Sequence, residues 1–229
     1  MTTVDVIMPS NGKEPHLVKM TQNCINTLLE SEDDVEFNIL VFEQQPTVNY
    51  QNAKTIHYSY PFNYNKIMND GIGRTSSPYV CMANNDLVFH HGWCSELLKW
   101  TEQYMSMSPR CPKAQKDMKR YATYEGYRIS KEMSGWCIFV KRELFDIIGA
   151  LDESMIFWFS DNIYADALQK HGIKHALISN SIVRHLTSKT VARVGVKSII
   201  EYTKGQKKIY AEKKKCCSEH PCDLQGECA

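Results

Sequence analysis

Short apolar runs rich in β-branched residues alternate along this chain with segments of helical periodicity, and this alternation constrains the fold more than any other feature. Residues 4–8 form the first such run and end at the turn-forming residues 9–12. Apolar residues then recur at helical spacing over residues 15–30. The predicted strands are residues 4–8, 37–42, 54–60, 79–83, 137–140, 174–178 and 182–183, and the predicted helices are residues 15–30, 65–72, 92–104, 142–148, 163–171 and 196–215.

This order of elements predicts a single Rossmann-like α/β domain with a mostly parallel central sheet and helices on both faces. We expect residues 106–131 to be irregular, because they lack either periodicity. At 229 residues the chain is long enough for one domain with a sizeable core and a short appendage. We place the domain at residues 1–195 and a basic helical extension with a cysteine-rich tail at residues 196–229.

Polar clusters follow several of the predicted strands. They are Pro9-Ser10-Asn11, Glu43 and Asn84-Asn85-Asp86. In open α/β sheets ligands bind beyond the carboxyl ends of the strands, so these clusters predict a binding site at that edge.

The chain carries no run of 18 apolar residues, so we predict no transmembrane segment. Its first residues lack the basic start and apolar run of a signal peptide, and we expect a cytoplasmic protein.

The net charge of +1 is unevenly distributed, with −4 over residues 1–183, +8 over residues 184–215 and −3 over the last fourteen. Such a concentrated basic segment indicates either contact with a polyanion or a solvated lysine-rich helix.

Three residues could take part in catalysis or metal binding, and each also has a purely structural interpretation. Asp86, after an apolar strand, could hold a hard divalent cation or could belong to an Asn/Asp turn. Asp161, beside three aromatic residues, could be a general base or a helix N-cap. His185 could complete a site of carboxylate and phosphate oxygens or could be a satisfied core histidine.

The order of the motifs resembles the inverting glycosyltransferases of family two, which share the GT-A (nucleotide-diphospho-sugar transferase) fold. Residues 4–11 resemble the opening strand and donor-binding turn, residues 61–71 the helix that begins Phe-Asn-aromatic, and residues 79–88 the strand that ends in the metal-binding Asp-x-Asp signature. The second half follows in order with Ser134-Gly135-Trp136-Cys137, Arg142-Glu143-Leu144-Phe145, Gly149-Ala150-Leu151-Asp152-Glu153, Ser160-Asp161 and Val183-Arg184-His185.

The resemblance implies a role for each matching residue. Asp86 corresponds to the principal metal-binding carboxylate, His185 to the histidine near the metal and diphosphate, and Asp161 to the catalytic base. Asn84 stands where the family has the first acid of the signature, Ser160 where many members have a second acid, and Glu43 where the usual residue is Asp. The expected contacts with the donor or sugar are Pro9, Ser10, Asn11, Glu43, Lys66, Asn84, Asn85, Gly135 and Trp136.

The resemblance therefore implies transfer of a sugar from a nucleotide-sugar donor to an acceptor hydroxyl, with inversion and with Mn2+ or Mg2+. Two other classes stay open from the residues alone. One is a sugar-nucleotide-binding module that has lost catalysis, because Asn84 weakens the metal signature. The other is a nucleotidyltransferase, which would use a similar arrangement of metal and diphosphate.

Residues 106–131, with seven Lys or Arg and interspersed tyrosines, and the basic residues 184–215 bear on the acceptor. They fit a polyanion such as a hydroxymethylated base in DNA, reached by taking the base out of its stack. They also fit a lipid-linked saccharide at an anionic membrane surface. The third hypothesis is a soluble glycan, with the charge merely solubilising the protein.

The nine cysteines fall into two groups. Cys24, Cys81, Cys94, Cys111 and Cys137 are scattered, and we expect them to behave as small buried hydrophobic residues. Four more lie in the last fourteen residues together with one histidine and form either a Zn2+ site or an unliganded tail. These residues are Cys216, Cys217, His220, Cys222 and Cys228.

Overall fold

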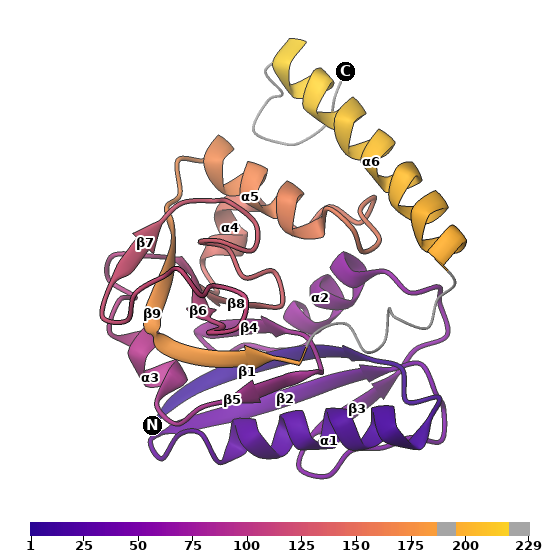
Figure 1. Ribbon diagram of the computed structural model, residues 1–229. Helices are drawn as coiled ribbons and strands as arrows, with labels where there is room; N and C mark the ends of the chain where they lie inside the picture. Colours follow the sequence, from indigo (N-terminus) through magenta and orange to yellow (C-terminus); the bar gives the residue numbers. More distant parts are fainter. Residues whose placement is uncertain (187–195, 220–229) are drawn as a thin grey trace.

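The computed structural model describes residues 1–186 and helix α6 over residues 196–219, with the side chains of that helix over residues 203–215 (Figure 1). The strands are β1 (Thr2–Ser10), β2 (Val35–Glu43), β3 (Lys54–His57), β4 (Tyr79–Ala83), β5 (Leu87–Phe89), β6 (Ser106–Arg110), β7 (Thr123–Glu125), β8 (Cys137–Lys141) and β9 (His175–His185). The helices are α1 (Pro15–Leu29), α2 (Tyr64–Ile72), α3 (Trp93–Leu98), α4 (Leu144–Ile148), α5 (Ser160–Lys170) and α6 (Val196–Glu219).

The strands form one sheet in the order β3-β2-β1-β4-β8-β6-β9-β5, and β7 pairs with β9. The half built from β3, β2, β1 and β4 is parallel, as predicted. In the other half β6 and β9 are parallel, whereas β8, β5 and β7 pair antiparallel with their neighbours. The described sheet is therefore mixed.

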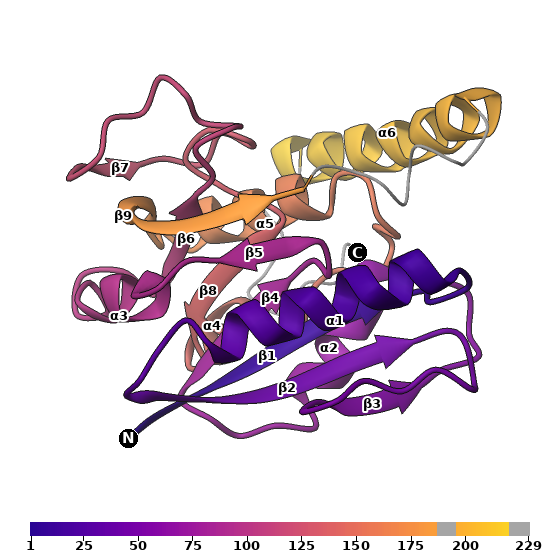
Figure 2. The same ribbon diagram turned by 60° about the horizontal axis from the view of Figure 1, so that its bottom comes forward.

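Side chains alternate between the two faces of the sheet, as strand geometry requires, and each face has its own core. On β4, Cys81 and Ala83 pack with α1 and α3, whereas Val80 and Met82 pack with α2, α4 and α5. Figure 2 shows α1 along one face of β1 and β2, with α2 behind the sheet. Helices therefore cover both faces, as the alternation of elements predicts.

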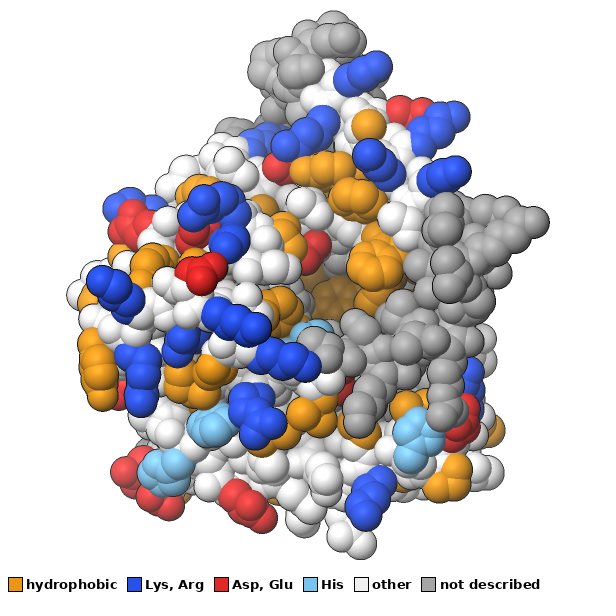
Figure 3. Space-filling model, in the orientation of Figure 1, with side chains coloured by type: hydrophobic (Ala, Val, Ile, Leu, Met, Phe, Trp, Pro, Cys, Tyr) orange, Lys and Arg blue, Asp and Glu red, His pale blue; other side chains and the backbone are white. Residues whose placement is uncertain are grey.

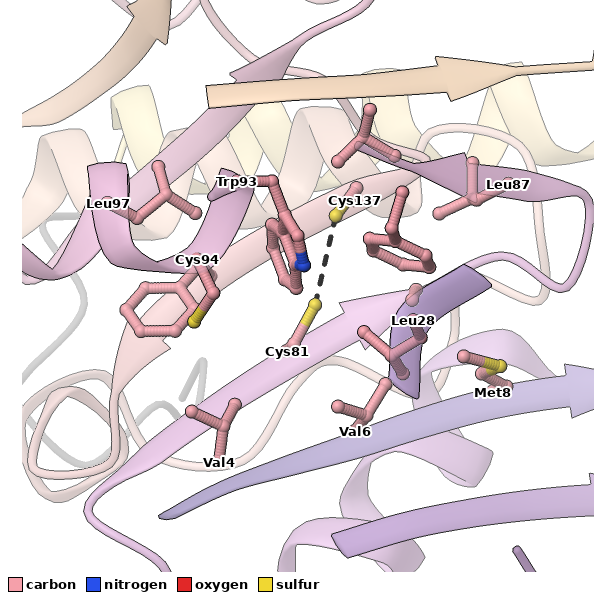
Figure 4. Close-up of a cluster of buried hydrophobic side chains, with 14 of the residues drawn as sticks. Val4, Val6, Met8, Leu28, Cys81, Leu87, Trp93, Cys94, Leu97 and Cys137 are labelled. Atoms are coloured by element: carbon pink, nitrogen blue, oxygen red, sulfur yellow. Dashed lines mark hydrogen bonds between the residues drawn. The ribbon is translucent and has the colours of Figure 1, made fainter. Parts of the chain in front are cut away.

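The core on the side of α1 and α3 contains four of the five scattered cysteines. The sulfur atoms of Cys81 and Cys137 lie 3.8 Å apart. Figure 4 shows this pair with Trp93 and Cys94 near it. All five cysteines are buried and free, and burial raises the pKa of Cys24 to about 12. They behave as small hydrophobic residues, which confirms the expectation for this group. The predicted tail site lies outside the residues and side chains that the structure describes.

Several predicted boundaries are wrong. Residues 106–131 are not irregular throughout, because they contain β6 and β7. β6 escaped prediction because Ser106 and Ser108 are buried in place of apolar residues and are satisfied by tertiary hydrogen bonds.

Other differences concern where elements begin and end, and one short strand was not predicted. The two strands predicted within residues 174–183 are one strand, β9, and Leu87–Phe89 forms an unpredicted strand that pairs with its end. The helix predicted over residues 92–104 has only Trp93–Leu98, and α5 begins at Ser160 rather than at residue 163. Among the described helices, none has both the length and the apolar character needed to cross a membrane.

Candidate active site

A pocket of about 630 Å³ opens at the carboxyl ends of β1 and β4, where the polar clusters were expected. Figure 3 shows it as a hollow with hydrophobic side chains on its floor and walls. Four elements bring side chains to it from distant parts of the sequence. They are Ser10 at the end of β1, Asp86 after β4, Asp161 in the first turn of α5 and His185 at the end of β9.

Asp86 and His185 form a buried pair in this pocket. Asp86 Oδ1 lies 3.1 Å from His185 Nε2, and the two side chains are only 7% and 14% exposed. The antiparallel pairing of β5 with β9 sets this distance, because it places Leu87 opposite His185 and lets Leu186 N donate to Asp86 O at 2.9 Å. The imidazole also stacks on Trp136, with ring centroids 5.1 Å apart and an interplanar angle of 15°.

This pair fits a divalent cation that is shared with a ligand. Among the described residues, no group of three or more His, Cys, Asp or Glu side chains could hold a metal ion alone. Cations bound together with phosphates commonly use only one or two carboxylates, and the phosphate oxygens complete the shell. Asp86 Oδ1 and His185 Nε2 are suitable donors for that arrangement.

Ser10, Asn84 and Asn85 line the pocket beside this pair. Asn85 Nδ2 donates to Thr21 Oγ1 at 2.8 Å, and Asn84 N donates to Trp136 O at 2.9 Å. These bonds fix the turn after β4 against α1 and against the segment before β8. The two residues that precede Asp86 are thereby fixed, which holds Asp86 at the pocket.

Glu43 does not line the pocket, so the expected direct contact of Glu43 with the nucleotide-sugar donor is wrong. It is fully buried, and its Oε1 accepts hydrogen bonds from Gly12 N and Gln45 N, both at 2.8 Å. Its Oε2 accepts from the Tyr50 hydroxyl at 2.7 Å. The next residue, Gln44, lines the pocket instead and accepts from Asn11 Nδ2 at 2.8 Å.

Lys66 also lies outside the pocket lining. Its Nζ is 3.9 Å from Asp70 Oδ1 and 3.8 Å from Glu153 Oε2, and it lies over the Tyr60 ring at 5.1 Å. The helical turn from Lys66 to Asp70 explains this geometry, because residues four apart are neighbours on a helix surface. Pro9, Asn11, Gly135 and Trp136, the other expected contacts, all line the pocket.

Asp161 lies in the first turn of α5, and the N-cap residue is Phe159, so the interpretation of Asp161 as the cap is wrong. Burial raises the pKa of the Asp161 carboxyl above its usual 3.8, against the backbone N–H groups of Asn162 and of Asp161 itself, which lower it. A carboxylate with raised proton affinity is suited to accept a proton near neutral pH.

Gly135 provides the space that Asp161 occupies. A Cβ atom at Gly135 would lie 2.5 Å from Asp161 Oδ2 and 3.0 Å from its Cβ. Contacts this short force one of the two residues to move. The absence of a side chain at position 135 is therefore a condition for the observed position of the carboxylate.

Three pocket-lining side chains have a buried polar atom with no hydrogen-bond partner among the described residues. These atoms are Tyr64 Oη, Trp136 Nε1 and Ser160 Oγ. Unpaired buried groups are rare in proteins, and their concentration around one pocket indicates polar capacity reserved for a ligand. Tyr64 and Gln44 were not predicted: Tyr64 is in a helix rather than at a strand end, and at the end of β2 the prediction chose Glu43 instead of its neighbour Gln44.

Two solved glycosyltransferase structures share this fold. The structure of GalNAc-T7 with UDP, GalNAc and Mn2+ matches with a TM-score of 0.63 and 9% identity, and covers 81% of this chain but only 44% of GalNAc-T7. A mutant of Drosophila β1,4-galactosyltransferase 7 with manganese, UDP-Gal and xylobiose matches with a TM-score of 0.55 and 13% identity, over 87% of this chain and 79% of that one. The sequence itself matches no protein-family model and no curated protein.

The described chain therefore has the GT-A fold of nucleotide-sugar glycosyltransferases, which confirms the predicted fold class. It spans less than half the length of the GalNAc-T7 chain that it matches. At such identities the likeness concerns the fold, and membership of the inverting family two stays a prediction.

Proposed function

We propose that this protein transfers a sugar from a nucleotide-sugar donor to an acceptor hydroxyl, with inversion at the anomeric carbon. The observation that carries the proposal is that Asp86, His185 and Asp161, far apart in sequence, line one pocket of a GT-A fold. Both fold neighbours were solved with manganese and a uridine nucleotide, which supports a donor of that class.

The donor diphosphate would lie beside Asp86 and His185. A divalent cation held there would neutralise the charge that develops on the departing diphosphate. Asp86 would supply a carboxylate oxygen and His185 its Nε2, while the stack on Trp136 keeps the imidazole oriented. Ser10, Asn11 and Asn84, which line the same pocket, would offer hydrogen bonds to the nucleoside.

Asp161 would act as the general base. Its carboxylate takes the proton of the acceptor hydroxyl as the acceptor oxygen bonds to the anomeric carbon. The bond from that carbon to the phosphate oxygen breaks, and its electron pair leaves with the diphosphate. Attack from the face opposite the leaving group inverts the configuration. The raised pKa of Asp161 favours this proton transfer over that of an ordinary, fully solvated aspartate.

The acceptor side of the pocket favours a saccharide. Its wall is aromatic, because the Phe157 ring contacts both Phe62, with centroids 5.8 Å apart, and Trp158, with centroids 5.0 Å apart. No Lys or Arg is among the described residues that line the pocket. Flat apolar rings suit the face of a sugar, and the galactosyltransferase neighbour was solved with xylobiose. Binding of xylobiose or a similar oligosaccharide, weighed against duplex DNA and anionic vesicles, would test this preference.

The experiment that tests the proposal compares Asp161→Asn with Asp146→Asn. Asp146 also lies in the first turn of a helix but is exposed and outside the pocket lining. We expect Asp161→Asn to lower transfer from a UDP-sugar by about 10²- to 10⁴-fold, the scale of a lost general base, with donor affinity retained. Asp146→Asn should match the wild type. A loss of donor affinity together with transfer would assign Asp161 a structural role instead.

The product released from the donor separates the other classes of protein. With added manganese, a transferase releases nucleoside diphosphate, whereas a nucleotidyltransferase releases pyrophosphate. A binding module releases neither and is still stabilised thermally by the donor. Retention of configuration in the isolated product would contradict inversion while leaving sugar transfer intact.

A further inference from the structure

One wall of the pocket is a loop, residues 151–159, which we call the wall segment. It contributes Leu151 and the three aromatic residues 157–159 to the pocket and leads directly into the turn of α5 that carries Asp161. Where this loop lies therefore decides both the shape of the acceptor side and the position of the carboxylate.

Helix α2 holds the first part of the wall segment by asparagine side chains. Asn69 bonds both backbone groups of Leu151 at 2.9 Å, and Asn65 Nδ2 donates to Asp152 O at 2.7 Å. Among the described residues, no side chain of α2 bonds the backbone of residues 156–159. Ile156 O accepts from Tyr64 N at 2.7 Å, and this is where the backbone contacts with α2 end.

Helix α6 holds that last part from the other side (Figure 1). Gln206, only 4% exposed, accepts a hydrogen bond from Ile156 N at 2.7 Å through its Oε1. The two backbone groups of Ile156 are thus shared between α2 and α6. A buried polar side chain that bonds a loop peptide fixes the path of that loop.

Tyr210 of α6 holds the residue next to the catalytic turn. Its ring stacks on Phe159, with centroids 5.2 Å apart and an interplanar angle of 16°, and its hydroxyl donates to Asp166 Oδ2 at 2.7 Å. Phe159 has φ of 66°, a left-handed conformation that is costly for a residue with a side chain. Such a conformation persists only where surrounding contacts enforce it, and the stack on Tyr210 is such a contact.

Two lysines of α6 complete the attachment. Lys213 Nζ lies 2.7 Å from Asp152 Oδ2, at the start of the wall segment, and Lys214 Nζ lies 3.2 Å from Asp166 Oδ1 on α5. Part of the basic charge of residues 184–215 is therefore neutralised within the protein. These contacts join α6 to both ends of the region that bears the aromatic wall and Asp161.

We propose that α6 is a positioning element of the active site, with Gln206 and Tyr210 as positioning residues that hold the wall segment and the first turn of α5 in the geometry needed for transfer. The role in transfer rests on the proposed function, whereas the hold on the wall segment does not. The contacts of α6 described above are with the wall segment and α5 rather than with Asp86 or His185, so we expect that pair to be unaffected.

The test uses full-length point variants and two independent measurements. Tyr210→Leu removes the stacked ring, Gln206→Leu removes the acceptor for Ile156 N, and Tyr210→Phe keeps the ring as the conservative variant. Lys207→Ala, on an exposed position of the same helix, is the control. The first measurement is hydrogen–deuterium exchange of the amides of residues 156–159. The second is the steady-state kinetics of transfer, together with the Kd for the UDP-sugar.

We expect faster exchange at residues 156–159 in Tyr210→Leu and Gln206→Leu, but not in Tyr210→Phe or Lys207→Ala. Transfer measured as kcat/KM for the acceptor should fall by roughly ten- to hundredfold in the first two, as expected for a misplaced wall, with donor Kd unchanged. Tyr210→Phe should retain most activity.

Two outcomes separate the failure of this inference from failure of the proposed function. If both leucine variants exchange the amides of residues 156–159 and transfer sugar at the same rates as the wild type, α6 has no positioning role, and the transferase proposal still stands. If the leucine variants exchange these amides faster but the wild type transfers no sugar, the contact of α6 with the wall segment is supported and the proposed transferase function is contradicted. Equal loss of donor affinity and acceptor turnover would also overturn the inference, because it would mean general destabilisation.

Discussion

Asp161 is the residue whose ionisation should dominate the pH dependence of activity. Burial raises its pKa, and a general base works only when deprotonated. Activity should therefore fall as the pH drops through that raised pKa, so that the acidic limb lies above the usual aspartate value of 3.8. The measurement is kcat/KM against pH at saturating manganese. A limb at or below the ordinary value would contradict this role.

The same raised pKa predicts the stability of Asp161→Asn. An acid whose pKa is raised by folding contributes stability below its unfolded pKa and loses it as pH rises through the folded pKa. At neutral pH the wild type therefore carries a buried charge that the asparagine variant lacks, and the variant should be at least as thermally stable. The difference in Tm should shrink in acid, where both side chains are neutral. A variant less stable at neutral pH would show that the carboxylate supports the fold.

Gly135 should be needed for activity because any side chain at this position would displace Asp161. In Gly135→Ala the new Cβ would lie 2.5 Å from Asp161 Oδ2, so the carboxylate must shift. We expect transfer to fall by roughly ten- to hundredfold, since catalytic groups tolerate little displacement, while donor affinity persists. Gly73→Ala is the matched control, because its Cβ would lie 3.5 Å from Asn69 O, an ordinary contact. Full transfer by Gly135→Ala would show that Asp161 need not lie where it does.

At the scale of elements, α2 has a supporting role that its sequence only hints at. Asn65 and Asn69 are poor helix formers within the nine residues of α2, and Asn63 is its N-cap, so all three asparagines indicate roles other than helix propagation. Asn63 caps the helix by accepting from Lys66 N at 3.1 Å, and the other two hold the wall segment. Asn69→Ala should destabilise the protein by about 1–3 kcal/mol, because the buried backbone of Leu151 loses its partners.

Lys66→Ala is the control for that measurement. Its ion pairs with Asp70 and Glu153 are long and partly exposed, so its loss should cost about 1 kcal/mol or less. Urea denaturation gives the free energy of unfolding of both variants. Equal losses in Asn69→Ala and Lys66→Ala would contradict the role of Asn69 in holding the wall segment. Donor affinity of Lys66→Ala should equal that of the wild type, since the side chain does not line the pocket.

Strand and helix periodicity predicted most elements, because apolar residues dominate their buried faces. β6 was missed for the opposite reason: Ser106 and Ser108 are buried and satisfied by partners that only the fold brings near. The site was predicted residue by residue from the resemblance, and most of these residues line the pocket. The pairing of Asp86 with His185 depends on β5 and on the continuity of β9, neither of which periodicity indicated.

At the scale of the whole molecule, Arg142 joins the parallel half of the sheet to the half that carries β8. Its Nη2 lies 2.6 Å from Asp5 Oδ2 on β1, and its Nε donates to Ser77 O at 2.6 Å. Asp5 is 1% exposed. Burial alone would raise the pKa of Asp5, but hydrogen bonds from Ser77, Asn38 and Thr75 outweigh it and hold that pKa below the usual value.

Removing Arg142 should leave the buried Asp5 carboxylate without its charged partner and remove the side-chain link between the two halves of the sheet. We expect Arg142→Met to cost about 3–5 kcal/mol of unfolding free energy at neutral pH, the scale of a broken buried pair. Lys141→Ala, the adjacent change, breaks only a partly exposed pair with Glu143 and should cost about 1 kcal/mol or less. Urea denaturation at neutral pH measures both, and similar losses would mean that the Asp5–Arg142 pair is not special.

The pH dependence of Arg142→Met distinguishes loss of charge pairing from loss of packing. A carboxyl whose pKa is lowered by folding contributes stability above its unfolded pKa and loses it as pH falls through the folded pKa. Wild-type stability should therefore decline in acid, as Asp5 is protonated and its ion pair with Arg142 is lost, whereas the variant has no such pair to lose. The gap between them should narrow towards acidic pH. A gap that stays constant would attribute the cost to packing around Arg142, and the two halves of the sheet would then be joined mainly by their apolar cores.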